Sequence, residues 1–407
     1  MRQMITVFCT LFLLVSLPGL NAQQQTADGG FVICGESMSY THGDTDFLIY
    51  KLDAAGAKEW RKNYGGGFFD DATSCVQTAD GGYVICGYTG SYTTGGYGNS
   101  DFLVYKLDAA GAKQWRKNLG GEYSEWPYSV IQTSDGGYLV TGQTSSYVHG
   151  LVNCDYDFLI YKLDATGAKQ WRKNYGGVST DWGFRAEQTA DGGYIVCGFT
   201  ESYTNGGYDF LAYKLDAAGN KQWRKNYGGI NDDRGMFIRQ TSDGGYVFSG
   251  HSDSYATPGL PGDRRGMAND ILVYRLDAAG NKLWRKHYGG TDWESGYDIR
   301  QTSDGGFIVC GDTATYSNGE HDFILYKLDA AGAKQWRKNF GGAGWDSASY
   351  VVQTADGGYF VLGGSSSYYH GAFENYDLLA YRLDAAGNKM WRKNYGGDQH
   401  EDIEAED

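Results

Sequence analysis

The chain has 407 residues, of which 41% are hydrophobic and 21% are charged, so it belongs to neither the disordered nor the fibrous class. It contains 62 Gly but only 4 Pro, which excludes collagen and proline-rich linkers. The 35 basic residues against 49 acidic ones give a net charge of −14, which argues against nucleic acid or an anionic membrane as a partner.

Residues 1–22 have the layout of a secretory signal peptide. Arg2 provides a basic start, an apolar run extends from Met4 to Leu17, and the small residue Ala22 ends the segment. The run is too short to span a bilayer, and no later stretch is apolar enough to do so. We therefore expect an exported protein without a membrane span, which is secreted, periplasmic or held at the cell surface.

A repeat of about 55 residues follows in seven copies, a period typical of repeat architectures. Each copy has Asp-Gly-Gly before Tyr or Phe, then Leu-Asp-Ala, then Trp-Arg-Lys and a closing Gly-Gly pair. The Asp-Gly-Gly segments begin at Asp28, Asp80, Asp135, Asp191, Asp243, Asp304 and Asp356. The repeat Trp residues are Trp60, Trp115, Trp171, Trp223, Trp284, Trp336 and Trp391. The copies cover approximately residues 23–66, 67–121, 122–177, 178–229, 230–290, 291–342 and 343–397.

Each copy predicts four strands, because its short runs rich in Val, Ile, Tyr, Phe and Trp are bounded by Gly and Asp. In the second copy the expected strands are residues 73–78, 83–88, 102–107 and 113–119. Asp80-Gly81 predicts a hairpin loop whose two central residues take positive φ. The segment from Asp108 to Gly111 predicts a type I turn with the Gly in the left-handed region.

The fold class that follows is all-β, a seven-bladed β-propeller of four-stranded antiparallel blades. The second and third strands of a copy are apolar on both faces, which indicates sheets covered on both sides. The first copy lacks most of its first strand, and the acidic tail at 398–407 aligns with the missing segment. We expect the N- and C-terminal segments to share blade one and so to close the ring.

The pattern D-G-G-(Y/F) … L-D-A-x-G-x-K-x-W-x-K-x-(Y/F)-G-G covers residues 25–397 and resembles that of secreted bacterial and archaeal β-propeller repeat proteins. The stretch Leu-Asp-Ala-Thr-Gly-Ala-Lys-Gln-Trp at 163–171 is also similar to the tryptophan-docking repeat of quinoprotein dehydrogenases. The first resemblance implies the propeller fold. The second implies that the Trp packs between neighbouring blades, and it makes a quinoprotein-like oxidoreductase one alternative function.

One face of the predicted propeller carries nearly all of the variation in loop length, and we call it the variable face. It holds the loops between second and third strands and the loops between blades, where binding residues are usually found. Trp126, Trp182, Trp293 and Trp345 all fall in the predicted loops between blades, and Tyr255 follows a second strand. Their rings suit stacking on sugars or anchoring a protein partner. The alternative is that these Tyr and Trp rings pack blade against blade.

The fifth copy has the longest loop, residues 254–269, which breaks the symmetry of the repeat. It contains Arg264 and Arg265, which we include among the candidate ligand-binding residues. The alternative is an insertion that the surface tolerates without any function.

Metal, cofactor and catalytic motifs are not apparent. An Asp opens the third strand of every copy and is expected to accept hydrogen bonds from loop amides, with calcium as the alternative ligand. No GxSxG elbow, phosphate-binding loop or CxxC motif is present. Cys75 faces Cys86 if the intervening loop has two residues, which would allow a disulfide. We expect no cofactor and no catalytic residue.

The leading hypothesis is therefore an exported, non-catalytic and monomeric binding or scaffold propeller that recognises a glycan or an extracellular protein. One alternative is a propeller enzyme, either the quinoprotein-like oxidoreductase or an enzyme that acts on polysaccharides. A second alternative is a structural repeat protein of a surface layer or matrix.

Overall fold

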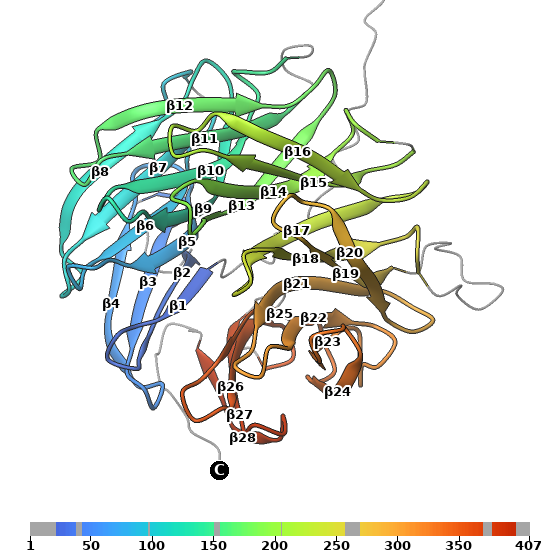
Figure 1. The fold of residues 1–407 in the computed structure, drawn as a ribbon. Coiled ribbons are helices and arrows are strands. Elements are labelled where there is room, and N and C mark those ends of the chain that lie inside the picture. The colour runs from blue at the N-terminus through green and yellow to red at the C-terminus, as the bar shows by residue number, and fades with distance from the viewer. Residues whose placement is uncertain are drawn as a thin grey trace, which may run out of the picture.

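The computed structural model describes residues 22–37, 43–96, 98–149, 155–204, 206–256, 269–368 and 377–395. These residues form seven antiparallel sheets of four strands, arranged as blades around a common axis (Figure 1). Within each sheet the strands follow one another in chain order. The predicted seven-bladed propeller is confirmed. Among the described residues there is no helix, and so none that could cross a membrane.

The blades have closely similar strand lengths. Blade one contains β1 (Ala22–Gln25), β2 (Phe31–Ser37), β3 (Asp46–Leu52) and β4 (Lys58–Tyr64). Blade two contains β5 (Asp70–Gln77), β6 (Tyr83–Thr89), β7 (Asp101–Leu107) and β8 (Lys113–Leu119). Blade three contains β9 (Glu125–Gln132), β10 (Tyr138–Thr144), β11 (Asp157–Leu163) and β12 (Lys169–Tyr175). Blade four contains β13 (Asp181–Gln188), β14 (Tyr194–Thr200), β15 (Asp209–Leu215) and β16 (Lys221–Tyr227).

The last three blades continue the series. Blade five contains β17 (Asp233–Gln240), β18 (Tyr246–Ser252), β19 (Asp270–Leu276) and β20 (Lys282–Tyr288). Blade six contains β21 (Glu294–Gln301), β22 (Phe307–Thr313), β23 (Asp322–Leu328) and β24 (Lys334–Phe340). Blade seven contains β25 (Asp346–Gln353), β26 (Tyr359–Ser365), β27 (Asp377–Leu383) and β28 (Lys389–Tyr395).

The first strand of each blade lies nearest the axis and the fourth lies outermost (Figure 1). Successive first strands, such as β9 and β13, contact each other around the ring. The second and third strands are buried along their whole length in most blades, whereas the fourth strands alternate exposed and half-buried residues. The Lys and Arg of the fourth strands therefore protect the outer edges from pairing with another chain.

The ring closes between blade seven and blade one. β25 contacts β1, and the rings of Phe31 and Phe360 stack with their centroids 3.8 Å apart. Phe31, Ile33 and Leu52 of blade one share a buried cluster with Leu362 of blade seven. β1 is formed by the N-terminal segment, at the place where the sequence analysis expected both termini to contribute. The predicted contribution of 398–407, like the predicted signal segment up to residue 21, lies outside the described residues.

The turn between first and second strands is longer than predicted. In blade two it spans residues 78–82, because Gly81 N–H donates to Thr78 O at 2.9 Å and Thr78 N–H donates to Gly82 O at 2.9 Å. The Asp80 carboxylate accepts hydrogen bonds from Thr78 Oγ1 (2.5 Å) and Gly82 N–H (3.0 Å). The two-residue loop that a Cys75–Cys86 pair would need is not formed, because this side chain stabilises a wider turn in which Gly81 takes a φ of 79°.

The longer turn also excludes the pairing of Cys75 with Cys86. Cys75 lies opposite Ile85, and Cys86 lies opposite Ser74. The two sulfurs belong to different hydrophobic clusters, one against blade one and the other against blade three. Both thiols are buried.

The repeat Trp joins each blade to the next one. Trp171 of β12 lies edge-on to Tyr194 of β14, with ring centroids 6.1 Å apart and an interplanar angle of 62°. The turn at Gly219 of blade four covers the same indole, since a Cβ at Gly219 would lie 2.8 Å from it. Gly219 has a φ of 78°, which confirms the predicted turn with Gly in the left-handed region.

Candidate functional site

Residues that differ between copies gather on the first strands. The first strands of blades two to seven all begin with a buried Asp or Glu and end with Gln, but the residues between these ends differ from blade to blade. Because these strands stand side by side around the axis, their side chains can produce local chemistry that the repeat does not share. The inner edge of the ring is therefore the place where a candidate site is expected.

An aromatic belt runs across blades three and four to the edge of blade five. We give this name to Trp126, Tyr156, Trp182, Phe199 and Tyr208. Tyr156 contacts Trp126 and Trp182 at centroid distances of 5.3 and 6.2 Å. Trp182 stacks on Phe199 at 5.0 Å, and Phe199 meets Tyr208 edge-on at 5.0 Å. All except Phe199 are half-buried, so each offers part of its ring to solvent.

Two features of the belt suit a ligand with oxygen atoms. The Nε1–H group of Trp182 is buried and has no hydrogen-bond acceptor among the described residues. Buried indole N–H groups normally find an acceptor. At the other end, the guanidinium of Arg234 lies 4.8 Å from the Tyr208 ring and is paired with Asp232 at 2.8 Å. The belt thus combines half-buried aromatic rings with polar groups at its edges.

The four candidate Trp residues divide into two groups. Trp126 and Trp182 are the second residues of β9 and β13, so they lie in strands at the variable face and not in the predicted loops. Trp293 donates from Nε1 to Ser295 Oγ at 2.8 Å, and Trp345 stacks on His321 at 3.7 Å. The latter two are half-buried in blades six and seven and are not linked to the belt by any of these ring contacts.

Tyr255 contacts a neighbouring blade in the same way as its equivalents. Its hydroxyl donates to Gly228 O at 2.7 Å, and Arg285 lies 3.4 Å above its ring. Tyr203 makes the same pair of contacts with Gly176 and Arg224 in blades three and four. This recurring geometry is the blade-to-blade packing that the sequence analysis named as the alternative. Arg264 and Arg265 lie outside the described residues.

A second copy-specific group is the axial arginine cluster, which consists of Arg185, Glu187, Arg239, Asp298 and Arg300 on β13, β17 and β21. Asp298 is fully buried and binds Arg239 Nη2 at 3.3 Å and Arg300 Nε at 3.0 Å. Burial alone would raise the pKa of Asp298, but the two guanidiniums hold it below its ordinary value. Burial raises the pKa of Glu187. Burial and the nearby charge of Arg239 both lower the pKa of Arg185.

Two carboxyls meet on the opposite side of the ring, between blades one and two. Burial and the nearby charge of Asp71 raise the pKa of Glu36 to about 8. Asp71 accepts a hydrogen bond from Thr45 Oγ1 at 2.5 Å. Burial and the neighbouring carboxylate therefore favour the protonated form of Glu36, and a protonated carboxyl is the form that acts as a general acid.

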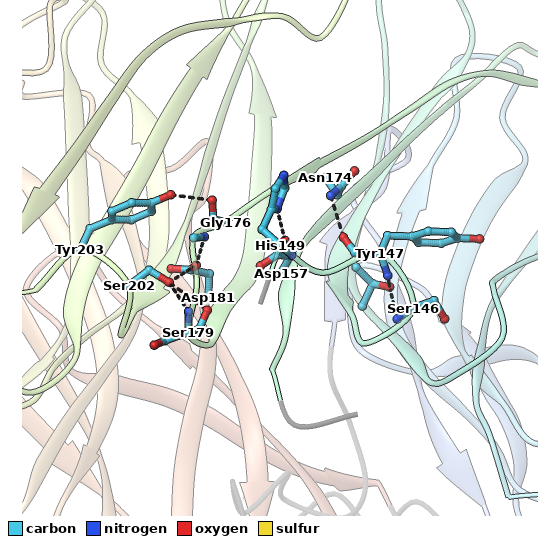
Figure 2. Close-up of polar contacts among 12 residues, drawn as sticks. Ser146, Tyr147, His149, Asp157, Asn174, Gly176, Ser179, Asp181, Ser202 and Tyr203 are labelled. Atoms are coloured by element: carbon cyan, nitrogen blue, oxygen red, sulfur yellow. Dashed lines mark hydrogen bonds and ion pairs between the residues drawn. The ribbon is translucent and has the colours of Figure 1, made fainter. Parts of the chain in front are cut away.

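Buried carboxylates also face each other at the joints between blades. Asp157 of β11 and Asp181 of β13 lie on either side of Gly176 (Figure 2), where a Cβ would lie 2.0 Å from Asp157 Oδ1 and 2.9 Å from Asp181 Oδ2. Asp181 Oδ2 accepts from Gly177 N–H and Ser202 Oγ, both at 2.7 Å. His149 N–H donates to Asp157 Oδ2 at 3.0 Å, as expected for the Asp that opens a third strand.

The described residues contain no group of three or more His, Cys, Asp or Glu side chains arranged to hold a metal ion. Calcium at the Asp residues that open the third strands stays an untested alternative. A cavity of about 200 Å³ between blades six and seven is lined largely by residues that recur in all or most blades, among them Asn339, Tyr368 and Arg392. It therefore offers little chemistry that distinguishes one joint from another.

Comparison with known proteins supports the fold alone. No family model matches the chain. A stretch of 112 residues, 24% of the chain, is 28% identical to the regulatory protein FlaEY of Caulobacter vibrioides, and the match spans only 12% of that protein. A puromycin hydrolase mutant aligns with a TM-score of 0.50 at 12% identity, over 91% of this chain and 52% of that one. The WD40 domain of Neurospora crassa Pan2 aligns with a TM-score of 0.50 at 11% identity, over 85% of this chain and 86% of that one.

Sequence reasoning found two members of the belt and missed the axial arginine cluster. Tyr156 and Tyr208 directly precede third strands, and Phe199 lies within a second strand that otherwise reads as core. The available signal was the difference between copies at equivalent positions of the first strand, where Arg239 and Arg300 replace the Val or Ile of blades two, three and seven.

Proposed function

We propose that this protein is an exported, non-catalytic binding propeller that recognises a glycan through its aromatic belt. The observation that carries the proposal is the continuous contact of five aromatic side chains from neighbouring blades, at positions where the repeat does not require them. Half-buried Trp and Tyr rings combine an apolar face with a polar edge, which suits the faces and hydroxyls of sugar rings. Their mutual packing also holds them rigid, which lowers the entropy lost on binding.

The test is an oligosaccharide binding screen followed by calorimetry on a Trp126→Ala/Trp182→Ala variant. Loss of two central aromatic anchors is expected to weaken binding at least about 30-fold, since truncation of one such anchor typically costs about 2 kcal/mol. Phe68→Ala is the matched control, because Phe68 is an aromatic residue that is 43% exposed and does not belong to the belt. Unchanged affinity in the double Trp variant, with the fold intact by circular dichroism, would refute the belt as the binding site.

The same screen separates the alternatives. A purified extracellular protein that binds the belt, with no glycan bound, would support the protein-partner version of the hypothesis. Release of sugar products by the wild-type protein would support a polysaccharide-acting enzyme. Quinone absorbance after incubation with the cofactor and calcium would support the oxidoreductase. Absence of any ligand for the native protein would favour a structural repeat protein.

A further inference from the structure

Contacts between side chains continue from the aromatic belt around the axis towards blade six. The guanidinium of Arg234 lies 5.8 Å from the ring of the belt residue Phe199 and 4.8 Å from that of Tyr208. Arg234 on β17 lies directly opposite His251 on β18. The ring of His251 lies 6.3 Å from that of Trp293, which directly precedes β21. The variable face therefore carries a second group of copy-specific side chains next to the belt.

This group contains an imidazole–carboxylate pair, His321 with Asp312, which we call the rim dyad. His321 Nδ1 lies 2.7 Å from Asp312 Oδ2, and Asp312 is only 1% exposed. Ser347 Oγ donates to Asp312 Oδ1 at 3.2 Å. Burial and the charge of Asp312 raise the pKa of Tyr297, so its hydroxyl stays protonated and can donate to the same carboxylate. The carboxylate is thus well supplied with donors, and it fixes the orientation of the imidazole.

The blade fold does not require the rim dyad. Asp312 is the next-to-last residue of β22, a position that the belt residue Phe199 occupies in β14. His321 directly precedes β23, as the belt residues Tyr156 and Tyr208 directly precede β11 and β15. The pair in blade six therefore replaces the aromatic contact of Phe199 with Tyr208 in blade four. Because the positions are equivalent, the rim dyad lies at the same level of the ring as the belt.

One nitrogen of the rim dyad is left for a ligand. The proton on His321 Nδ1 faces the Asp312 carboxylate, so Nε2 carries a lone pair. Nε2 has no hydrogen-bond partner among the described residues, yet it is not one of their buried unpartnered side-chain atoms, so it reaches solvent. The half-buried indole of Trp345 stacks on the imidazole at 3.7 Å with an interplanar angle of 13°. The site therefore offers a fixed hydrogen-bond acceptor beside an aromatic ring.

A second imidazole in this group also lacks partners. His251 is 8% exposed, and neither of its ring nitrogens has a hydrogen-bond partner. Buried polar groups of this kind are normally paired, so the position of His251 between the belt and the rim dyad points to a ligand there.

The charges around these two imidazoles favour a neutral ligand. The guanidinium of Arg234 is already paired with Asp232 at 2.8 Å. Burial and the charge of Arg234 lower the pKa of His251 to about 3, so this ring is neutral at pH 7. An anionic group at His321 Nε2 would be repelled by the nearby carboxylate of Asp312, whereas a hydroxyl group can donate to Nε2 without this penalty.

We propose that the rim dyad and Trp345 form a second sugar subsite, in which His321 Nε2 accepts a hydrogen bond from a hydroxyl group of a neutral oligosaccharide that also lies on the aromatic belt. The inference rests on the proposed function and adds to it the class of glycan, a neutral chain with free hydroxyl groups. It also gives the path of the chain, from blades three and four past His251 to blade six. Asp312 is a positioning residue, because it acts through His321.

The first experiment compares neutral and acidic probes, which are 1,4-linked hexasaccharides of glucose, mannose, xylose and galacturonic acid. Calorimetry with the wild-type protein is expected to show that at least one neutral probe binds, and that it binds at least about tenfold tighter than the galacturonate probe. The physical reason is that the acidic probe brings carboxylates towards Asp312, in a chain whose net charge is −14.

The second experiment removes the acceptor. His321→Phe/Asp312→Asn keeps a flat ring beside Trp345 and leaves no unpaired carboxylate. This variant is expected to bind the tightest neutral probe about tenfold more weakly, which is the size of one hydrogen bond. His287→Asn is the matched control, because His287 forms a similar pair with Asp270 at 2.9 Å on the outermost strand of blade five, where the other blades carry Asn. Its affinity should stay within about twofold of wild type.

A nuclear magnetic resonance experiment tests the orienting role of Asp312 separately from packing. In ¹H–¹⁵N correlation spectra, wild-type His321 should carry its proton on Nδ1, and the tightest neutral probe should shift the Nε2 resonance. Asp312→Asn should move the proton to Nε2, because the amide can donate to Nδ1. An Nε2 resonance that does not change when the wild-type protein is saturated with the probe would overturn the inference.

Unchanged affinity of the His321→Phe/Asp312→Asn variant, with the fold intact by circular dichroism, would also overturn it. So would binding of the galacturonate probe as tight as that of every neutral probe, or absence of binding of all neutral probes at millimolar concentration. None of these results would refute the proposed function, which depends on the loss of glycan binding in the Trp126→Ala/Trp182→Ala variant.

Discussion

A buried cation on the third strand anchors each Asp-Gly-Gly turn. Lys162 is 3% exposed, and its ammonium group binds Asp135 at 2.8 Å and Leu163 O at 3.0 Å. Arg275 and Arg382 replace this Lys in blades five and seven and bind the equivalent Asp243 and Asp356. The carboxylate remains half exposed while the cation is enclosed, so the interaction mainly satisfies the buried charge.

Asp135→Asn is therefore expected to destabilise the protein by about 1–2 kcal/mol. This is less than the loss of a fully buried ion pair, because the carboxylate is partly solvated. The measurement is urea denaturation, with Asp135→Asn/Lys162→Met as the control. Removing both charges should recover most of the lost stability. If Asp135→Asn alone were as stable as the wild type, Asp135 would not be the group that satisfies the buried charge of Lys162.

At the scale of elements, the fourth strand 113–119 and the start of the second strand at Tyr83 agree with the sequence-based prediction. The first strand of that blade was predicted at 73–78 but is Asp70–Gln77. Asp70 and Asp71, at the start of this strand, are poor strand formers by their intrinsic propensity. In the folded protein Asp70 is buried because its carboxylate accepts hydrogen bonds from Gly66 N–H and Ser91 Oγ, both at 2.7 Å.

The two turn glycines of blade four should differ in their tolerance of substitution. Gly192 and Gly219 have φ values of 81° and 78°, so Ala is strained by about 1–2 kcal/mol at either place. A Cβ at Gly192 meets no atom within 4 Å, whereas one at Gly219 lies 2.8 Å from the Trp171 indole. Gly219→Ala is therefore expected to lower the urea midpoint clearly more than Gly192→Ala. Equal midpoints would contradict the covering of Trp171 by this turn.

For the whole molecule, two sets of carboxyls make stability depend on pH in opposite directions. Hydrogen bonds from Thr and Lys, which outweigh burial, lower the pKa of turn carboxyls such as Asp80, Asp135, Asp191 and Asp304 to about 2. The contribution of these carboxyls to the free energy of unfolding is complete above their ordinary pKa of 3.8, and it is lost as the pH falls through 2. Burial raises the pKa of Asp157 and Asp209 to about 6, so their contribution is complete below 3.8 and is lost as the pH rises through 6.

The free energy of unfolding is therefore expected to be highest between about pH 4 and pH 5 and lower at both pH 2 and pH 7. Chemical denaturation across this range checks the profile. Asp157→Asn/Asp209→Asn should reduce the loss of stability between pH 5 and pH 7 and leave the acid side unchanged. A wild-type stability that rises steadily from pH 4 to pH 7 would be inconsistent with the buried carboxyls described here.

The sequence by itself determined the blade and the number of blades, because strand propensity, turn glycines and the repeated Trp act over short distances and recur in every copy. It did not determine which unrepeated residues meet. Trp126 and Trp182 come together only because first strands separated by a whole repeat stand side by side around the axis. Arg239 and Asp298 meet for the same reason. The candidate site therefore depends on ring geometry, which short-range sequence patterns do not encode.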